Sequence, residues 1–302
     1  MADAAPFLAI VNPAAGGGRC GRRAPAAIDR LRAAGLAVEV ATTGRPGEAA
    51  EIAEAAFARG RRRFIAVGGD GTSQEIVAGI FRHRATHTER PELGFLPLGT
   101  GNSFLRDFTD DPAAHGARCL AQGRTRPCDV LLCEHDEGVL HFLNLLSTGF
   151  VAKVNDLRQF RLRRLGQLGY VAAVVAQVAG LAPEVLPIRL DDDVRIDEPL
   201  AFCSFNNSKF TGGKMMMAPS ADTADGRIEV VMVRALSRRR LLAAFPRIFR
   251  GSHVTLPEVS VHRARTVVFE QPRPMALMVD GEALRLRPRR LGVLEHALTI
   301  YA

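Results

Sequence analysis

The sequence predicts an α/β domain over residues 1–130 and a β-rich domain over residues 131–302, with return of the last strand to the first domain left open. Up to about residue 130, short apolar runs alternate with helical patterns, which is typical of βαβ units and a mainly parallel sheet covered on both faces. Beyond that point strand-like runs follow one another with few helical patterns between them. A chain of 302 residues, 47% of them hydrophobic, is long enough to bury the cores of two domains.

In the first domain, brief apolar runs predict strands at residues 7–11, 37–41, 64–67 and 94–97. Helical spacing predicts helices at residues 24–34, 47–59 and 73–81, the first two closed by Gly35 and Gly60. Thr72 and Glu75 have the spacing of a capping box, which would start the third helix directly after its glycines.

In the second domain, strands are expected at residues 130–133, 139–146, 188–190, 201–206, 228–233, 266–270 and 276–279. Helices are expected at residues 154–182 and 238–249. The apolar stretch at 168–182 is shorter than the roughly 20 residues that a membrane span needs.

The bulk composition excludes some classes of function. The formal net charge is +8, and only three residues are lysines, so arginine supplies nearly all the basic excess. Such an excess suits phosphorylated ligands or anionic surfaces. Nucleic acid is not expected, since the chain has no Trp, two Tyr and no helix-turn-helix or zinc-finger spacing. The five scattered cysteines predict buried thiols in a reducing cytoplasm, and the N-terminus does not resemble a signal peptide.

Three glycine-rich segments in the first domain share one physical device. They are Asn12 to Arg19, Gly68 to Thr72, and Pro97 to Asn102, and each follows a predicted strand. Ligands of open α/β sheets bind outside the carboxyl ends of the strands, where all three turns should lie. Glycines let backbone N–H groups approach phosphate oxygens, and a helix N-terminus adds a favourable dipole.

Asp70 is an unusual residue to find among amides that bind anions. Its carboxylate would repel a phosphate unless Mg²⁺ lay between them, although an Asp that only organises its own turn is the alternative.

Two other nucleotide-binding motifs do not fit this sequence. The G-x-G-x-x-G match beginning at Gly16 follows its strand too late for a dinucleotide fingerprint, and the first lysine of the chain is Lys153, which excludes a Walker A loop.

The ordered set of motifs closely resembles the diacylglycerol kinase catalytic-domain superfamily, in its bacterial lipid kinase branch, with sphingosine kinases as relatives. Beyond the three glycine segments, the matching motifs are Ser147-Thr148-Gly149-Phe150, Gly212-Gly213-Lys214-Met215, Ala218-Pro219-Ser220-Ala221 leading to Asp225-Gly226, and Asp280-Gly281-Glu282. The resemblance implies a phosphofructokinase- and NAD-kinase-like first domain, a β-sandwich second domain and catalysis in a cleft between them.

The resemblance also implies roles for individual residues. The nucleotide-contacting positions would be Asn12, Thr43, Gly68, Gly69, Asp70, Gly71, Thr72, Ser73, Gln74, Gly99, Thr100, Gly101 and Asn102. Asp70 and Asp129 match acidic residues around a catalytic magnesium. Asp225, with the backbone carbonyls of Asp222 and Arg227, matches a second, structural magnesium site.

Asp280 and Glu282 match the acidic pair that activates the acceptor hydroxyl, and Asp70 completes the catalytic set. If that segment is extended, both acids point the same way, as a base and its partner would. Val-Asp-Gly-Glu is also good sequence for a hairpin turn, so that alternative stays open.

The expected function is therefore an ATP- and Mg²⁺-dependent lipid kinase acting on diacylglycerol or a sphingoid-like lipid, peripheral at the inner membrane, with a homodimer left open. The sequence departs from the usual family pattern at three positions: Ser103 and Val151 stand where the family usually has Asp, and Gln74 stands where it has Asn. Asp107 could replace the carboxylate missing at Ser103 only if the chain folds back. Open alternatives are a kinase of NAD⁺ or a sugar phosphate, and a catalytically weakened binding regulator. The adjacent Met215, Met216 and Met217 are interpreted as core filling rather than an acyl channel.

Overall fold

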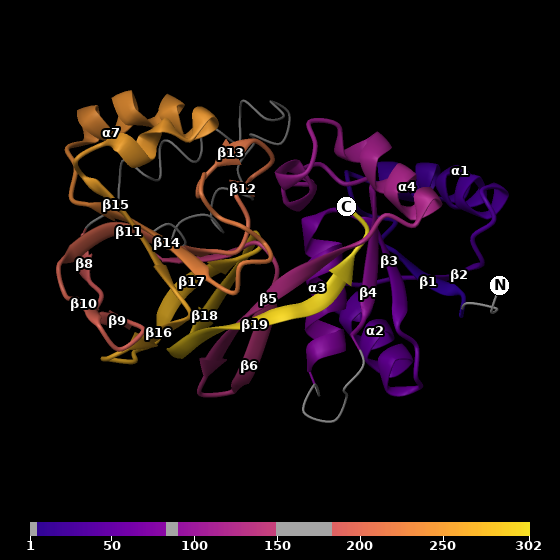
Figure 1. Cartoon of the computed structure of the whole chain (residues 1–302), viewed down its shortest axis with the longest axis horizontal. Helices are drawn as coiled ribbons and strands as arrows, with labels where there is room; N and C mark the ends of the chain where they lie inside the picture. The colour runs from indigo at the N-terminus through magenta and orange to yellow at the C-terminus, as the bar shows by residue number, and fades with distance from the viewer. Residues whose placement is uncertain (1–4, 83–89, 149–182) are drawn as a thin grey trace.

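The computed structural model describes residues 5–82, 90–148 and 183–302. The helix predicted at 154–182 and the apolar stretch within it lie outside these residues. Two parts are visible in Figure 1, an α/β part that holds the N-terminus and a part made mostly of strands. The predicted fold class, α/β followed by β, is confirmed.

The first part is built on four parallel strands in the order β4-β3-β1-β2. The strands are β1 (Phe7–Val11), β2 (Val38–Thr42), β3 (Arg63–Gly68) and β4 (Glu92–Pro97). The helices are α1 (Arg19–Ala33), α2 (Glu48–Ala58), α3 (Asp70–Phe81) and α4 (Pro112–Gln122), with a short 3₁₀ helix η2 (Phe104–Asp107) before α4.

Alternation along each strand builds a core on each face of this sheet. In β3, Phe64 and Ala66 join the cluster that contains residues of α2 and α3. Ile65 and Val67, pointing to the other face, join the cluster that contains residues of α1 and α4. The strands are therefore apolar on both sides, as strands of a parallel sheet covered by helices must be.

The second part packs an extension of the first sheet against a separate seven-stranded sheet. The extension contains β5 (Arg126–His135), β6 (Gly138–Phe142), β9 (Ile188–Leu190), β10 (Val194–Ile196), β16 (Thr266–Phe269) and β19 (Pro288–Ile300). The second sheet contains β7 (Leu145–Thr148), β8 (Glu184–Val185), β11 (Pro199–Asn206), β14 (Ile228–Arg234), β15 (Val259–Ala264), β17 (Met275–Val279) and β18 (Glu282–Leu286). One hydrophobic cluster contains residues from both sheets, which makes this part a sandwich.

The remaining short elements lie outside both sheets. They are β12 (Phe210–Thr211) and β13 (Met215–Met216), which pair with each other, the helix α7 (Arg238–Ala244), and the 3₁₀ helices η4 (Phe245–Arg250) and η5 (Ser252–Thr255). The long strand β19 runs from the sandwich into the first part, where Thr299 and Ile300 pair with β4 (Figure 1). None of the helices in the described ranges is long and apolar enough to cross a membrane.

Several predicted boundaries were wrong. Helix α1 begins at Arg19 rather than at residue 24, and α3 begins at Asp70 rather than at residue 73. The strand predicted at 139–146 is two strands, β6 and β7, which belong to different sheets. The helix predicted at 238–249 ends at Ala244 and continues as η4, because Pro246 cannot donate the hydrogen bond that an α-helix requires.

The predicted capping box at Thr72 and Glu75 was also wrong. Gly69 is the N-cap of α3, and no side chain caps it. The Glu75 carboxylate instead accepts hydrogen bonds from the backbone N–H groups of Gly47 (3.1 Å) and Ala49 (3.2 Å) at the start of α2. Glu75 therefore supplies a negative charge at the N-terminus of a neighbouring helix, where it stabilises the helix dipole.

Candidate active site

The three glycine turns meet at the carboxyl edge of the parallel strands. They follow β1, β3 and β4, which are neighbours in the sheet. The Asn12 N–H donates to the Val67 carbonyl, and the Gly99 N–H donates to the Gly68 carbonyl at 2.7 Å, so adjacent turns are tied together. Thr43, just after β2, joins the same edge because its N–H donates to the Val11 carbonyl. The structure thus brings together positions that lie far apart in the sequence.

The three turns pack so closely that only glycine fits at three of their positions. A Cβ added to Gly99 would lie 2.5 Å from the Gly69 Cα, and one added to Gly101 would lie 2.9 Å from an Asp70 carboxylate oxygen. A Cβ on Gly16 would lie 2.9 Å from the Leu98 carbonyl oxygen. The absent side chains leave backbone amides within reach of a ligand at this edge.

A small pocket between the second and third turns contains an unpartnered polar atom. It is lined by Gly68, Gly69, Asp70, Ser73, Asn102 and neighbouring apolar residues. Asn102 has a φ of 51°, and its side-chain N–H₂ donates to the Pro97 and Gly99 carbonyls. Its Oδ1 atom is buried without a hydrogen-bond partner. A buried acceptor is costly when unpaired, so this atom fits a site that a ligand completes.

The Asp70 carboxylate lies at the start of α3 and is held by the third turn. It accepts hydrogen bonds from the N–H groups of Ser103 (2.8 Å) and Phe104 (3.3 Å). Burial raises the pKa of Asp70, and the two hydrogen bonds only partly offset this rise. A carboxylate beside glycine amides and an unpaired amide oxygen offers the oxygen ligands that Mg²⁺ prefers.

The other nucleotide positions of α3 are largely buried. Thr72, Ser73 and Gln74 are all less than a tenth exposed. The Ser73 hydroxyl donates to the Asp70 carbonyl, and the Thr72 side chain packs against Gly68. Thr100 is exposed at the third turn, and Asn12 accepts a hydrogen bond from the Ala14 N–H. Their nucleotide contacts remain predictions.

Asp280 occupies a hairpin turn between β17 and β18. Its φ is 47° and that of Gly281 is 93°, which suits the tight turns that join antiparallel strands. Its carboxylate accepts hydrogen bonds from the N–H groups of Leu143 (2.9 Å) and Asn144 (2.9 Å), which separate β6 from β7, and of Leu145 (2.8 Å), the first residue of β7. Burial raises the pKa of Asp280 to about 7; the three amides oppose this rise, and the nearby charge of Asp70 adds to it.

The extended geometry expected for Asp280-Gly281-Glu282 was wrong, because the segment is the hairpin turn that the sequence left open. Asp280 is buried, at 8% exposure, whereas Glu282 is exposed at the start of β18. The turn therefore gives the two acids different surroundings. Asp280 has the buried position of a candidate base, and the role of Glu282 remains a prediction.

Asp129 lies with the second predicted metal site. Its carboxylate accepts hydrogen bonds from the N–H groups of Gly226 (2.7 Å) and His296 (2.6 Å). Burial raises the pKa of Asp129, the two hydrogen bonds oppose this rise, and the charge of Asp225 adds to it. Asp222 and Asp225 each accept a hydrogen bond from an N–H two residues ahead. No cluster of three acidic, His or Cys side chains fit to hold a metal occurs among the described residues. The predicted site uses one carboxylate and two carbonyls, Asp222 and Arg227 supplying the latter, so it remains a prediction.

Polar contacts that sequence reasoning missed join the two parts beside Asp70. The Ser103 hydroxyl accepts a hydrogen bond from the Gly213 N–H at 2.8 Å. The Asp107 carboxylate accepts the Lys209 N–H through both oxygens, at 2.9 and 3.1 Å, and burial raises its pKa to about 7. Ser103 thus links the third turn to the second part, and Asp107 binds backbone of that part.

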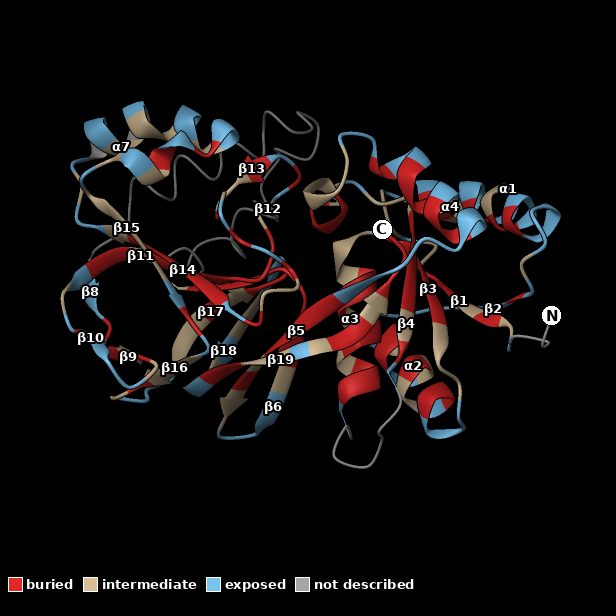
Figure 2. Ribbon diagram, viewed as in Figure 1, coloured by how far each residue is buried: buried red, intermediate tan, exposed pale blue. Residues whose placement is uncertain are grey.

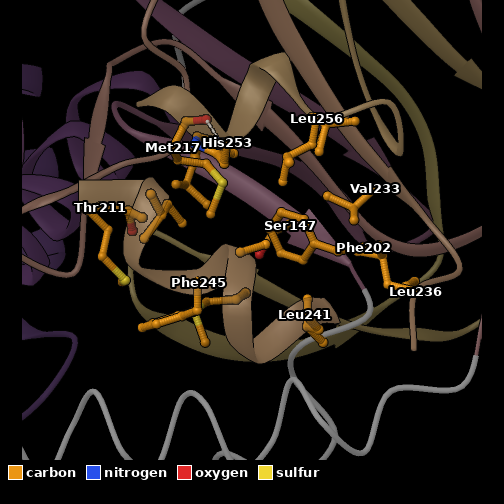
Figure 3. A pocket seen from close by; sticks show the side chains of 17 residues that line it. Ser147, Phe202, Thr211, Met217, Val233, Leu236, Leu241, Phe245, His253 and Leu256 are labelled. Carbon is orange, nitrogen blue, oxygen red and sulfur yellow. Dashed lines mark hydrogen bonds between the residues drawn. The ribbon is translucent and has the colours of Figure 1, made fainter. Parts of the chain in front are cut away.

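A large apolar pocket lies in the second part, next to Asp280. The pocket is open to solvent, and its cavity volume is about 130 Å³. Its walls are side chains of β7, β11, β14 and β17 on one side and of α7, η4 and η5 on the other, which point toward one another in Figure 3. Leu145, whose N–H binds Asp280, also lines the pocket. Met215 and Met217 do so as well, so these methionines form a wall of the pocket rather than only filling a core.

One polar side chain stands out within that apolar lining. His253 is 7% exposed, and its Nε2 lies 3.0 Å from the Met217 carbonyl, as the dashed line in Figure 3 marks. A carbonyl only accepts, so Nε2 carries the proton, and burial lowers the pKa of the ring.

The five cysteines are all buried free thiols, as predicted.

Comparisons with known proteins match both parts of the chain. Residues 6–133 match the family model described as the diacylglycerol kinase catalytic domain, and residues 144–302 match the YegS C-terminal NAD kinase beta sandwich-like domain. A diacylglycerol kinase of Mycobacterium tuberculosis is 33% identical over 300 residues, covering 97% of this chain and 93% of that protein. A probable YegS-like lipid kinase of Xanthomonas campestris is 28% identical and covers 85% of this chain and 84% of its own. The solved structure of a putative diacylglycerol kinase from Bacillus anthracis has a TM-score of 0.78 at 22% identity, covering 98% of this chain and 96% of that one, and shows the same fold.

Proposed function

Because the chain belongs to the diacylglycerol kinase family, which includes YegS-like lipid kinases, we propose that it transfers the γ-phosphoryl of ATP to a lipid hydroxyl in a Mg²⁺-dependent reaction. Diacylglycerol is the acceptor we favour, with a sphingoid-like lipid as the neighbouring choice. The relatives that are 33% identical and cover 97% of this chain bear the name diacylglycerol kinase, and the apolar pocket suits acyl chains.

One observation supports this proposal above all others. Asp280 is near both Asp70 of the predicted phosphate site and the wall of the apolar pocket. On one side the charge of Asp70 reaches it and raises its pKa. On the other side it binds the N–H of Leu145, whose side chain lines the pocket. A lipid whose chains filled the pocket would have its polar end near Asp280 and close to the phosphate site.

The residues divide the work of phosphoryl transfer. The amides of the glycine turns and the N-terminus of α3 would bind the phosphates of ATP. Asp70 would hold Mg²⁺, which when bound neutralises phosphate charge. Ionised Asp280 would accept the proton of the lipid hydroxyl, and the three amides that bind its carboxylate fix its position.

The test is transfer of labelled phosphate from ATP to a panel of acceptors in mixed micelles. The panel holds diacylglycerol, ceramide, a sphingoid base and phosphatidylglycerol, with NAD⁺ and a sugar phosphate as non-lipid acceptors. Wild type is compared with Asp280→Asn, which should lose about 10²- to 10⁴-fold in kcat. Addition of EDTA should stop the wild-type reaction.

Asp191→Asn is the matched control. Asp191 also has a φ of 47°, and its Oδ1 accepts hydrogen bonds from the N–H groups of Arg265 and Thr266, at the turn after β9. It should retain activity. Labelled NAD⁺ or sugar phosphate without labelled lipid would contradict the proposal, as would nucleotide binding with no turnover on any acceptor.

A further inference from the structure

The segment formed by α7 and η4 (residues 238–250) is unusually basic. It contains five arginines, and no Asp or Glu occurs from residue 235 to residue 257. The segment also forms one wall of the apolar pocket. In Figure 1 it lies at the outer end of the second part, away from the first part. We call residues 238–250 the basic segment.

The basic segment has two distinct faces. Leu241, Ala244, Phe245 and Ile248 line the pocket, with the spacing of one face of a helix. Arg239, Arg247, Phe249 and Arg250 are exposed on the outside, and Figure 2 shows the outer side of α7 as mainly exposed. An inner apolar wall and an outer cationic surface therefore belong to the same short segment.

Three of the outer arginines have no anionic partner within the described part of the chain. Arg240 pairs with Glu258, but Arg239, Arg247 and Arg250 form no ion pair there. Many other arginines in the described part do pair with acids, such as Arg63 with Glu92 and Arg234 with Glu198. Phe249, at 39% exposure, is the one aromatic side chain among the exposed large hydrophobic residues described.

We propose that the outer face of the basic segment docks the enzyme on an anionic bilayer surface, with Phe249 entering the headgroup region and the pocket opening toward the membrane. The proposal rests on the proposed function, since the pocket needs a bilayer beside it only if it takes a lipid. A double-chain lipid should not cross water to reach the pocket, because exposing its acyl chains to water is strongly unfavourable. Arginines and an aromatic side chain at the pocket wall are what an interfacial segment presents to headgroups.

Charge sets the expected strength of the effect. Each basic side chain near an anionic surface strengthens partition by roughly fivefold, so three free arginines contribute on the order of 100-fold. The contribution falls as salt rises, because the Debye length shortens from about 10 Å at 0.1 M to about 3 Å at 1 M. Neutral vesicles should bind the protein far more weakly.

The experiment is sedimentation of the full chain with vesicles of phosphatidylcholine containing 30% phosphatidylglycerol, against pure phosphatidylcholine, at 0.1 M and 1 M salt. The test variant is R239Q/R247Q/R250Q, and the matched control is R23Q/R30Q/R59Q. The control removes the same charge from arginines of the first part that are exposed and form no ion pair within the described residues. Thermal melting confirms that both variants fold, and Phe249→Ser tests insertion of the aromatic ring.

The expected result is a loss of binding to anionic vesicles on the order of 100-fold in the test variant, with the control nearly unchanged and Phe249→Ser intermediate. Equal loss in both triple variants would overturn the proposal, because net charge alone would then govern binding. So would vesicle binding that none of the variants alters, or competition by duplex DNA without any vesicle binding. Because the assay needs no turnover, its failure can be told apart from failure of the kinase proposal.

Discussion

Replacing Asp280 with asparagine measures how much the buried carboxylate lowers the free energy of unfolding. Its Oδ1 accepts two amide hydrogen bonds, from Asn144 and Leu145, and its Oδ2 accepts one, from Leu143. Asparagine has the same shape and keeps the oxygen that accepts two of them. Its amide nitrogen, however, would place a donor opposite the Leu143 N–H. The substitution therefore removes the charge and disturbs one of the three hydrogen bonds.

The pKa of Asp280 fixes the sign of the effect. Burial raises the pKa from its ordinary 3.8 to about 7 in the folded protein. Between these values the folded state holds a proton that the unfolded state has lost, so the free energy of unfolding falls as pH rises. The slope is about 1.4 kcal/mol per pH unit in the middle of the range, which amounts to about 3 kcal/mol lost between pH 5 and pH 8. The asparagine variant lacks this contribution.

Urea unfolding of wild type and Asp280→Asn at pH 5, 6, 7 and 8, without nucleotide and with EDTA, isolates this contribution. The difference between the two proteins cancels distant titrating groups and leaves Asp280 with its interaction with Asp70. At pH 5 Asp280 is neutral in the folded protein but already ionised in the unfolded chain, so wild type has by then lost about 2 kcal/mol that the variant, apart from its disturbed hydrogen bond, does not lose. From pH 5 to pH 8 the variant should gain about a further 3 kcal/mol relative to wild type.

A pH-independent difference would refute the reasoning. It would mean that three amide hydrogen bonds outweigh burial and keep the carboxylate ionised at every pH tested. Asp191→Asn is again the control, since both amide N–H groups that it binds reach one oxygen, which asparagine retains.

Three further predictions concern rate, substrate and packing. If ionised Asp280 is the base, kcat/KM should rise about tenfold per pH unit up to about pH 7 and then level off; a profile flat from pH 5 to 8 would contradict this. Phe245→Ala should raise KM for long-chain diacylglycerol by about tenfold while leaving KM for ATP unchanged, because Phe245 lines the pocket; equal effects on both substrates would argue against the pocket as the lipid site. Gly79→Ala should lower the unfolding free energy by about 1–3 kcal/mol in a urea titration, because the added Cβ would lie 2.1 Å from the Ala50 carbonyl oxygen. Gly71→Ala is the control and should be near neutral or stabilising, because the space around Gly71 is open.

The first part was predictable because its signals are local. Each strand of the parallel sheet is a short apolar run, and each glycine turn follows a strand directly, so the edge where the turns meet follows from chain order. Helix α4 was missed even though its ends carry clear signals. Asp111 caps it, Pro112 opens it and Gly123 closes it in the left-handed conformation. Its apolar positions were too few to stand out beside the glycine motifs.

The boundary errors at α3 and in β6 and β7 have a common cause in tertiary contacts. Glu75 had the spacing to cap its own helix, but α2 lies beside α3 and offers amides that lack partners. The run from 139 to 146 reads as one strand, yet the chain breaks at Leu143 and Asn144, whose amides turn toward Asp280. A local sequence pattern cannot predict this break, because the carboxylate that binds these amides lies 136 or 137 residues further along the chain.

The apolar pocket shows most plainly why the rest could not be read from the sequence. Its wall combines alternate residues of strands far apart in the chain, such as Ser147, Phe202 and Met278, with one face of the basic segment. Each strand alone has the pattern of a half-buried strand, and α7 alone has the pattern of a surface helix. What makes the pocket is the failure of these two apolar faces to close on each other. Apolar faces that can close normally do so, and the opening that these two leave near Asp280 is the feature on which the proposed lipid site depends.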